Sequence, residues 1–204
     1  MYYRYILNEL HFHASSEHTF NKTIYDLEMH LVHSKDNNFT FQANPGLTVD
    51  PDAQQQKLVV GILFSTNNSK TNLAQTTNNT FIQALKLWNI NATVDNFTLN
   101  SFSSPNKNFF HYEGGLTTPA CQEFVNWIVM TEIESISANQ YQEFMKIQKG
   151  LGYNSTNRRI QALNGRKIYY SDMNFIPSVL KTNAGNILRY YSYLIIFILL
   201  LTLI

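Results

Sequence analysis

The sequence predicts one mixed domain of α and β structure in which strands dominate, followed by a C-terminal tail. The chain has 204 residues, of which 44% are apolar, enough for a single packed core. Most of its apolar segments either alternate with polar residues or form short continuous runs, and both patterns are typical of strands. No internal repeat and no clear linker divides the body of the chain.

The first two predicted strands place histidines on one face and apolar residues on the other. Residues 5–13 put Glu9, His11 and His13 on one face, because successive side chains of a strand point to opposite sides. Residues 25–33 put Glu28, His30 and Val32 on one face. The opposite faces carry the apolar residues together with one more histidine: Leu10, Phe12, Leu27, Met29, Leu31 and His33. The apolar faces are expected to build a core while the histidines line a cavity.

The remaining elements follow from short apolar runs and one capping signal. Residues 58–64 and 124–130 are predicted to be buried strands, and residues 77–88 a helix with an apolar stripe at Phe81, Leu85 and Trp88. Ser137 and Gln140 form a capping box, which predicts a helix that runs to about Lys149 and ends at Gly150. Residues 153–166 are expected to be irregular, and 168–170 to form a last strand.

Charge, cysteine content and the C-terminus limit the partners and the localisation that the sequence supports. The net charge of +1 does not favour a nucleic-acid partner or an anionic surface. The single cysteine, Cys121, is either a free thiol or half of a disulfide. Residues 190–204 are almost entirely apolar. As a helix they reach roughly 22 Å, short of a bilayer core of about 30 Å, so a lipid-anchor signal and a short membrane anchor are equally good interpretations.

The histidines suggest a metal site. His11 and His13 project to the same side of one strand, and a neighbouring strand supplies His30. Three neutral imidazoles with a fourth position left open are typical of catalytic zinc, which lowers the pKa of a bound water from about 15.7 to about 7. The alternative is that some of these residues are ordinary core or surface histidines.

Three segments resemble the alpha-class carbonic anhydrases, in family order from about residue 5 to residue 170. They are residues 13–18 with 27–33, residues 114–121, and residues 157–166. The resemblance implies a central, largely antiparallel, twisted sheet with a few peripheral helices. It also implies a Zn²⁺ cofactor and the reversible hydration of CO2 to bicarbonate and a proton by zinc-bound hydroxide.

The resemblance assigns roles to individual residues. His11, His13 and His30 match the zinc ligands, and Thr117 matches the threonine that accepts a hydrogen bond from the zinc-bound hydroxide while donating its own proton to Glu17. Three further residues match partners of the ligands: Glu28 for His30, the carbonyl of Asn157 for His13, and Glu9, where the family usually has Gln, for His11. The residues matching the substrate pocket are Val32, Val59, Leu116, Thr118, Val125 and Trp127.

Other residues receive supporting or structural roles. Tyr112, Arg159 and His18 match positions in supporting hydrogen-bond networks. His33 is expected to be structural and His111 to lie on the surface.

The resemblance begins late in the family's domain, which leads to the hypothesis that the chain is part of a longer, secreted protein. The portion before the His-x-His strand, with some central strands, a proton-shuttling histidine and the disulfide partner of Cys121, is expected to be missing. Residues 1–178 are assigned to the truncated catalytic domain and 179–204 to a spacer and hydrophobic anchor, which predicts a membrane-anchored protein on the extracellular face. The alternative functions are a non-catalytic, membrane-tethered binding domain of the same fold and a zinc hydrolase acting on esters.

Overall fold

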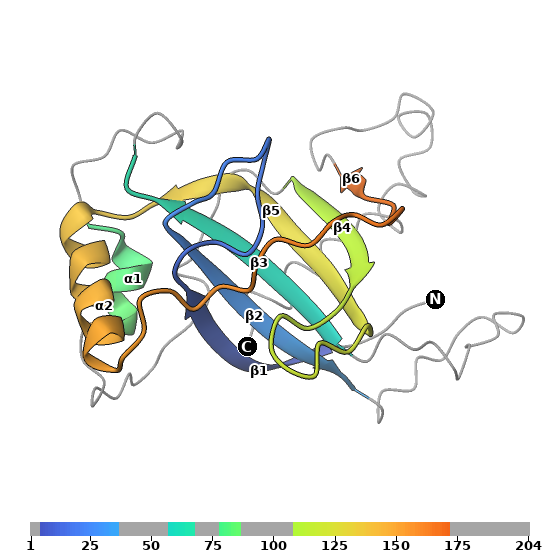
Figure 1. Cartoon of the computed structure of the whole chain (residues 1–204), viewed down its shortest axis with the longest axis horizontal. Coiled ribbons are helices and arrows are strands. Elements are labelled where there is room, and N and C mark those ends of the chain that lie inside the picture. The colour runs from blue at the N-terminus through green and yellow to red at the C-terminus, as the bar shows by residue number, and fades with distance from the viewer. Residues whose placement is uncertain (1–4, 37–56, 68–77, 87–107, 172–204) are drawn as a thin grey trace, which may run out of the picture.

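The computed structural model describes residues 5–36, 57–67, 78–86 and 108–171. In chain order the elements are β1 (Tyr5–His13), β2 (Leu27–Lys35), β3 (Lys57–Ser65), α1 (Thr80–Leu85), β4 (Phe109–Gly114), β5 (Val125–Ser135), α2 (Ala138–Gly150) and β6 (Tyr169–Ser171). The predicted fold class is confirmed, because strands dominate and the helices are few and peripheral (Figure 1).

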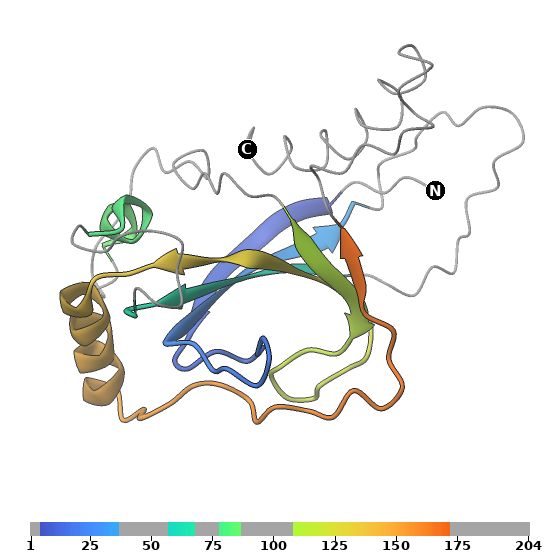
Figure 2. The ribbon, with the colours of Figure 1, turned by 90° about the horizontal axis from the view of Figure 1, so that it is seen from above.

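The described strands form one six-stranded sheet in the order β1-β2-β3-β5-β4-β6. Four of the five strand pairs are antiparallel, and β3 with β5 is the parallel pair. Figure 2 shows the two helices at one end of the sheet and the connecting segments 14–26, 115–124 and 151–168 on one side of it. These segments are the ones that complete the site described below.

The two faces of the sheet divide the buried residues as the strand pattern predicts. One face carries the larger cluster, in which β2, β3 and both helices contribute Leu27, Met29, Leu31, Val60, Ile62, Phe64, Phe81, Ile82 and Phe144. The other face carries His30 together with a smaller apolar cluster of Val59, Val125 and Trp127. The antiparallel register places His11 opposite His30 and Val32 opposite Val59, so this second face is continuous across three strands.

Helix α2 has the capping box that the sequence predicts. The Ser137 hydroxyl accepts a hydrogen bond from the backbone N–H of Gln140 at 3.1 Å, and the Gln140 side chain accepts one from the backbone N–H of Ser137 at 3.3 Å. The same Gln140 amide exchanges hydrogen bonds of 2.9 Å with the backbone of Asn79, the N-cap of α1. Gln140 is buried, and its side chain hydrogen-bonds backbone groups at the first turns of both helices.

Several boundaries differ from the predictions. Strand β4 was not predicted, because its sequence Phe-Phe-His-Tyr-Glu-Gly has no clear alternation of apolar and polar residues. Strand β5 runs to Ser135, beyond the predicted end at residue 130, and its pairing with β3 shifts between Gly61 and Leu63. Helix α1 ends at Leu85, and Trp88 lies outside the described residues.

Neither helix in the described part of the chain is long and apolar enough to cross a membrane. The segment 179–204 and the predicted domain boundary at residue 178 lie outside the described residues.

A carboxylic acid on β5 makes the fold sensitive to pH. Burial, followed by repulsion from Glu132, raises the pKa of Glu134 to about 7. Between its ordinary pKa of about 4.5 and 7 the folded chain therefore binds more protons than the unfolded chain, and stability falls as pH rises through that window.

We predict that Glu134→Gln stabilises the protein at pH 8 and leaves stability unchanged near pH 4. The expected gain in the free energy of unfolding at pH 8 is about 1–2 kcal/mol, reduced from the full value of the shift because the side chain is partly exposed. Urea unfolding at the two pH values measures it. Glu143→Gln, at an exposed position of α2, is the matched control and is expected to show no such difference. Equal effects of Glu134→Gln at both pH values would contradict the assignment.

Candidate metal centre

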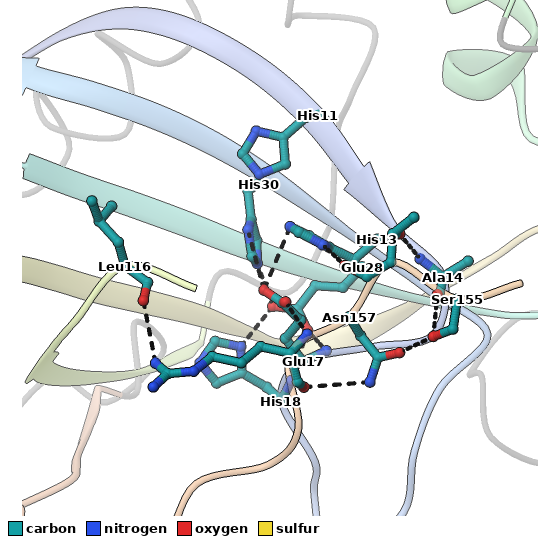
Figure 3. Close-up of polar contacts among 12 residues, drawn as sticks. His11, His13, Ala14, Glu17, His18, Glu28, His30, Leu116, Ser155 and Asn157 are labelled. Carbon is teal, nitrogen blue, oxygen red and sulfur yellow. Dashed lines mark hydrogen bonds and ion pairs between the residues drawn. The ribbon is translucent and has the colours of Figure 1, made fainter. Parts of the chain in front are cut away.

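Three histidine side chains converge on one point from the adjacent strands β1 and β2. One nitrogen each from His11, His13 and His30 lies within 4.8 Å of the other two. The ring centroids are 4.9 Å apart for His11 and His13, 5.2 Å for His11 and His30, and 4.7 Å for His13 and His30 (Figure 3). The predicted metal-binding set is therefore brought together by the β1–β2 register.

The hydrogen-bond partners of the ring nitrogens show whether these residues fit a zinc ion. The Nε2 atom of His13 is buried and has no hydrogen-bond partner among the described residues, which is costly unless the atom binds an ion or a water. His30 uses its Nε2 in a hydrogen bond, which leaves the lone pair of Nδ1 for the shared point. Neutral imidazoles are preferred zinc ligands. The donor set fits zinc, and His11, His13 and His30 would hold it.

Burial keeps two of the three imidazoles neutral near pH 7. Burial lowers the pKa of His30 below 6.5, and the opposing effect of Glu28 does not restore it. Burial also lowers the pKa of His11, helped by repulsion from His30 and His13. Because only the neutral ring can donate a lone pair to a metal, these shifts favour metal binding at physiological pH.

Glu28 is the predicted partner of His30 and holds a larger network. Its Oε1 accepts hydrogen bonds from His30 Nε2 at 2.8 Å and from His18 Nδ1 at 2.6 Å. Its Oε2 accepts the backbone N–H groups of Glu17 and His18, both at 2.8 Å. The carboxylate is fully buried, and all of its contacts come from donors (Figure 3).

These donors determine the charge of Glu28. Burial by itself would raise its pKa, but the interactions with His18 and His30 outweigh it and hold the pKa well below its ordinary value. A carboxylate in this position fixes the tautomer of His30 and makes its metal-facing nitrogen a better donor.

His18 and Tyr112 extend the network, as predicted. The Nε2 of His18 lies 2.7 Å from the hydroxyl of Tyr112. Burial raises the pKa of Tyr112, so its hydroxyl stays neutral and donates to the ring, whose Nδ1–H is directed at Glu28. This network also orients the carboxylate that supports His30.

The partner of His13 is a backbone carbonyl one residue before the predicted one. Nδ1 of His13 lies 3.0 Å from the carbonyl oxygen of Thr156, so the prediction of Asn157 is wrong. The reason is that Thr156 pairs with Ala14. The Ala14 N–H donates to the Thr156 hydroxyl at 3.0 Å, and the Ala14 carbonyl accepts from the Thr156 N–H at 2.6 Å. The Asn157 side chain instead accepts a hydrogen bond from the Ser155 hydroxyl.

His11 lies at the more open side of the cluster, beside Glu9. Its Nδ1 is 2.8 Å from Glu9 Oε1, so the predicted pair lies in contact, but the structure does not show the predicted hydrogen bond between them. The Glu9 side chain is 62% exposed, so water screens its charge.

Glu17 reaches the cluster but does not make the predicted hydrogen bond to Thr117. Its Oε1 accepts the backbone N–H of Arg158 at 2.6 Å. Its buried Oε2 has no hydrogen-bond partner and lies 3.4 Å from His13 Nε2 and 4.0 Å from His30 Nδ1. Thr117 is half-buried and lines the same cavity as Glu17. The segment 115–124 is held instead through Leu116, whose N–H donates to Gln122 and whose carbonyl accepts from Arg158.

The apolar wall of the site is present next to the histidines. Val59, Val125 and Trp127 are buried together, and Val32 and Leu116 pack against them. The Trp127 ring is 4.8 Å from the ring of His30. Thr118, the other predicted pocket residue, is exposed. Five of the six predicted pocket residues thus form one surface beside the metal-binding point.

Other predicted residues lie away from the cluster. His33 is buried on the opposite face, with its Nδ1 3.3 Å from the Leu58 carbonyl. His111 is exposed and stacks on Tyr169 at 4.9 Å. Within the described residues Cys121 is a free thiol.

Three residues of the site were not identified from the sequence: Thr156, Arg158 and Gly61. Thr156 and Arg158 reach His13 and Glu17 through backbone groups, which no side-chain pattern reveals. Gly61 pairs with His30 across β2 and β3, and a Cβ atom there would lie 2.9 Å from Glu28 Oε1. A glycine inside a buried apolar strand is the signal that could have indicated this close approach.

The sequence matches the eukaryotic-type carbonic anhydrase profile over residues 1–172. The chain belongs to this family. It is 32% identical over 173 residues to "Alpha carbonic anhydrase 8" of Arabidopsis thaliana, covering 81% of the chain and 38% of the relative. It is 30% identical over 164 residues to "Carbonic anhydrase" of Klebsiella pneumoniae, covering 80% and 57%.

A solved structure of the same family is also similar to this chain. The alpha-carbonic anhydrase of Thermovibrio ammonificans, solved with the inhibitor sulfanilamide, is 29% identical with a TM-score of 0.58. The match covers 81% of this chain and 63% of that structure. The chain thus spans less than two thirds of the length of each of these relatives.

We predict that Gly61→Ala weakens zinc binding by about 10–100-fold, the range for loss of a partner that orients a metal ligand. The added methyl group displaces the Glu28 carboxylate that holds His30. A competitive titration with a zinc-binding dye measures the affinity. Gly150→Ala, where nothing lies within 4 Å of the added Cβ, is the matched control. Unchanged zinc affinity in Gly61→Ala would show that Glu28 does not support the site.

Proposed function

We propose that this protein is a zinc-dependent carbonic anhydrase, which converts CO2 and water to bicarbonate and a proton. The observation that carries the proposal is the convergence of three imidazoles, two of them buried and one with an orphaned Nε2, beside an apolar wall. Membership of the carbonic anhydrase family supports the same activity.

The chain's own residues would prepare the site for the ion. Glu28 and the Thr156 carbonyl orient His30 and His13, so that each presents a lone pair to the shared point. A zinc ion bound there supplies a water that is acidic enough to act as a nucleophile near neutral pH.

The apolar wall suits a small, uncharged substrate. Val32, Val59, Val125 and Leu116 offer no hydrogen bonds, and the indole N–H of Trp127 is already bound to the Gly115 carbonyl at 3.1 Å. CO2 gains from such a surface because it has no net charge and little need for hydration. The polar product bicarbonate gains less, which favours its release.

Glu17 and Thr117 would align the nucleophile. Glu17 offers one unused carboxylate oxygen beside the cluster, and Thr117 faces the same cavity. A threonine hydroxyl that donates to this oxygen can only accept on its other side, which orients a donor next to it. The two side chains do not make this bond in the described structure, so a small movement of segment 115–124 is part of the proposal.

The same observation favours a second candidate function. A zinc-binding domain without turnover would need the histidine cluster but not the bond between Thr117 and Glu17. In that case the protein is a non-catalytic, membrane-tethered binding domain of the family fold. For either function we propose that the complete protein is anchored on the extracellular face of a membrane through residues 179–204.

We predict that the chain binds one zinc ion and that His30→Ala lowers zinc affinity by at least 100-fold, because one of three ligands and the link to Glu28 are lost together. Metal analysis after dialysis measures zinc content. Stopped-flow CO2 hydration, with and without an aromatic sulfonamide, measures activity.

His111→Ala is the matched control, since His111 lies outside the cluster. Sulfonamide-sensitive hydration that is lost in His30→Ala supports the enzyme. Stoichiometric zinc without hydration favours the binding domain. Full zinc content in His30→Ala would contradict both.

A further inference from the structure

The direction in which Thr117 points depends on the peptide group that precedes it. The carbonyl oxygen of Leu116 and the Cα atom of Thr117 belong to the same planar peptide unit, so a bond that holds this oxygen also limits where Thr117 lies. The Leu116 carbonyl accepts a hydrogen bond from the guanidinium group of Arg158 at 3.3 Å (Figure 3). Among the described residues, this is the bond that fixes the peptide unit between Leu116 and Thr117.

The peptide unit before it is held from two sides without Arg158. The Gly115 carbonyl accepts a hydrogen bond from the indole N–H of Trp127 at 3.1 Å. The Leu116 N–H donates to the Gln122 carbonyl at 3.0 Å. The chain is therefore anchored up to Leu116, and the direction of the next residue depends on Arg158.

Arg158 also holds Glu17, the proposed partner of Thr117. Its backbone N–H donates to Glu17 Oε1 at 2.6 Å, which leaves Oε2 as the oxygen near the histidines. Arg158 is half-buried and lines the same cavity as Glu17 and Thr117. Since the N–H and the guanidinium group belong to one residue, Arg158 sets the distance between the carboxylate and the peptide unit of Thr117.

The neighbouring arginine makes no comparable contact. Arg159, which the family resemblance places in a supporting network, is exposed. Its backbone carbonyl accepts a hydrogen bond from the Gln161 side chain at 2.6 Å, but within the described residues its guanidinium group has no hydrogen bond or ion pair. Of the two arginines, Arg158 is the one that links segment 115–124 to Glu17.

We propose that Arg158 is the positioning residue that sets the Thr117 hydroxyl against the unused oxygen of Glu17. Its guanidinium group holds the peptide unit of Thr117 while its N–H holds the carboxylate, so both partners are placed relative to one residue. This inference rests on the proposed function, in which Thr117 and Glu17 align the nucleophile. Because a guanidinium group stays protonated near neutral pH, its hold on the segment does not depend on pH in that range.

The contact leaves room for the movement that the proposed function requires. At 3.3 Å the bond is longer than the usual length of about 2.9–3.0 Å. The side chain of Arg158 also has several rotatable bonds. Segment 115–124 can therefore approach Glu17 while the Leu116 carbonyl stays bound.

The first test needs no enzymatic activity. Amide hydrogen exchange of segment 115–124 is measured by mass spectrometry in the full chain, without zinc and with zinc. We predict that Arg158→Met speeds exchange in this segment by about tenfold or more, because a hydrogen bond from a charged donor is lost. Lys146→Met removes the same charge from an exposed position of α2 and is expected to leave the exchange unchanged. Unchanged exchange in Arg158→Met would overturn the proposal.

The second test asks whether Arg158 acts through Thr117. In the zinc-loaded chain, Arg158→Met is expected to lower kcat/KM for CO2 hydration by about 10–100-fold at unchanged zinc content, since the backbone N–H of residue 158 and the three histidines remain. In a Thr117→Val background, which lacks the hydroxyl, the same change is expected to cost less than about threefold. Equal losses in the two backgrounds would contradict the proposal, because Arg158 would then act on another part of the site.

The two tests separate this inference from the proposed function. A wild type that binds zinc without hydrating CO2 would refute the proposed activity, and hydrogen exchange would then decide alone whether Arg158 holds segment 115–124. Arg158→Gln, which is polar but shorter, takes the place of Arg158→Met if that variant does not fold, and the same results are expected of it.

Discussion

The buried carboxylate of Glu28 is the interaction on which the rest of the site depends. It is fully enclosed and receives hydrogen bonds from two imidazoles and two backbone N–H groups. A buried charge without partners costs several kcal/mol, so the folded state is stable only when these donors surround the carboxylate. Through them it fixes the ring of His30, the turn at residues 17–18 and the position of His18, which in turn binds Tyr112.

The remaining ligands are positioned by contacts between distant parts of the chain. The β1–β2 register sets His11 opposite His30, and the pairing of Ala14 with Thr156 brings a carbonyl to His13 across more than 140 residues. The metal centre therefore forms only when the sheet and the segment after α2 are both in place. The proposed zinc binding would be coupled to folding for the same reason, since only the folded chain brings the three histidines together.

Strand parity made the core of the site predictable. A period of two assigns Glu28, His30 and Val32 to one face without any knowledge of the fold, and the structure confirms it through the register with β3. What could not be predicted rests on the backbone. The carbonyl that bonds to His13 was expected at Asn157 but belongs to Thr156. The Arg158 N–H that donates to Glu17 was not predicted. Every residue has a backbone carbonyl and almost every residue a backbone N–H, so the sequence does not mark which ones are used. Strand β4 was missed because its side chains do not alternate clearly.

The most direct test of the account is X-ray absorption spectroscopy of the zinc-loaded chain. We predict three imidazole nitrogens at about 2.0–2.1 Å and one oxygen donor, in a four-coordinate site. Replacement of His30 by Ala should reduce the imidazole count or abolish binding. A spectrum with fewer than three imidazoles in the wild type, or with a sulfur ligand from Cys121, would contradict the claim that these three histidines share one ion.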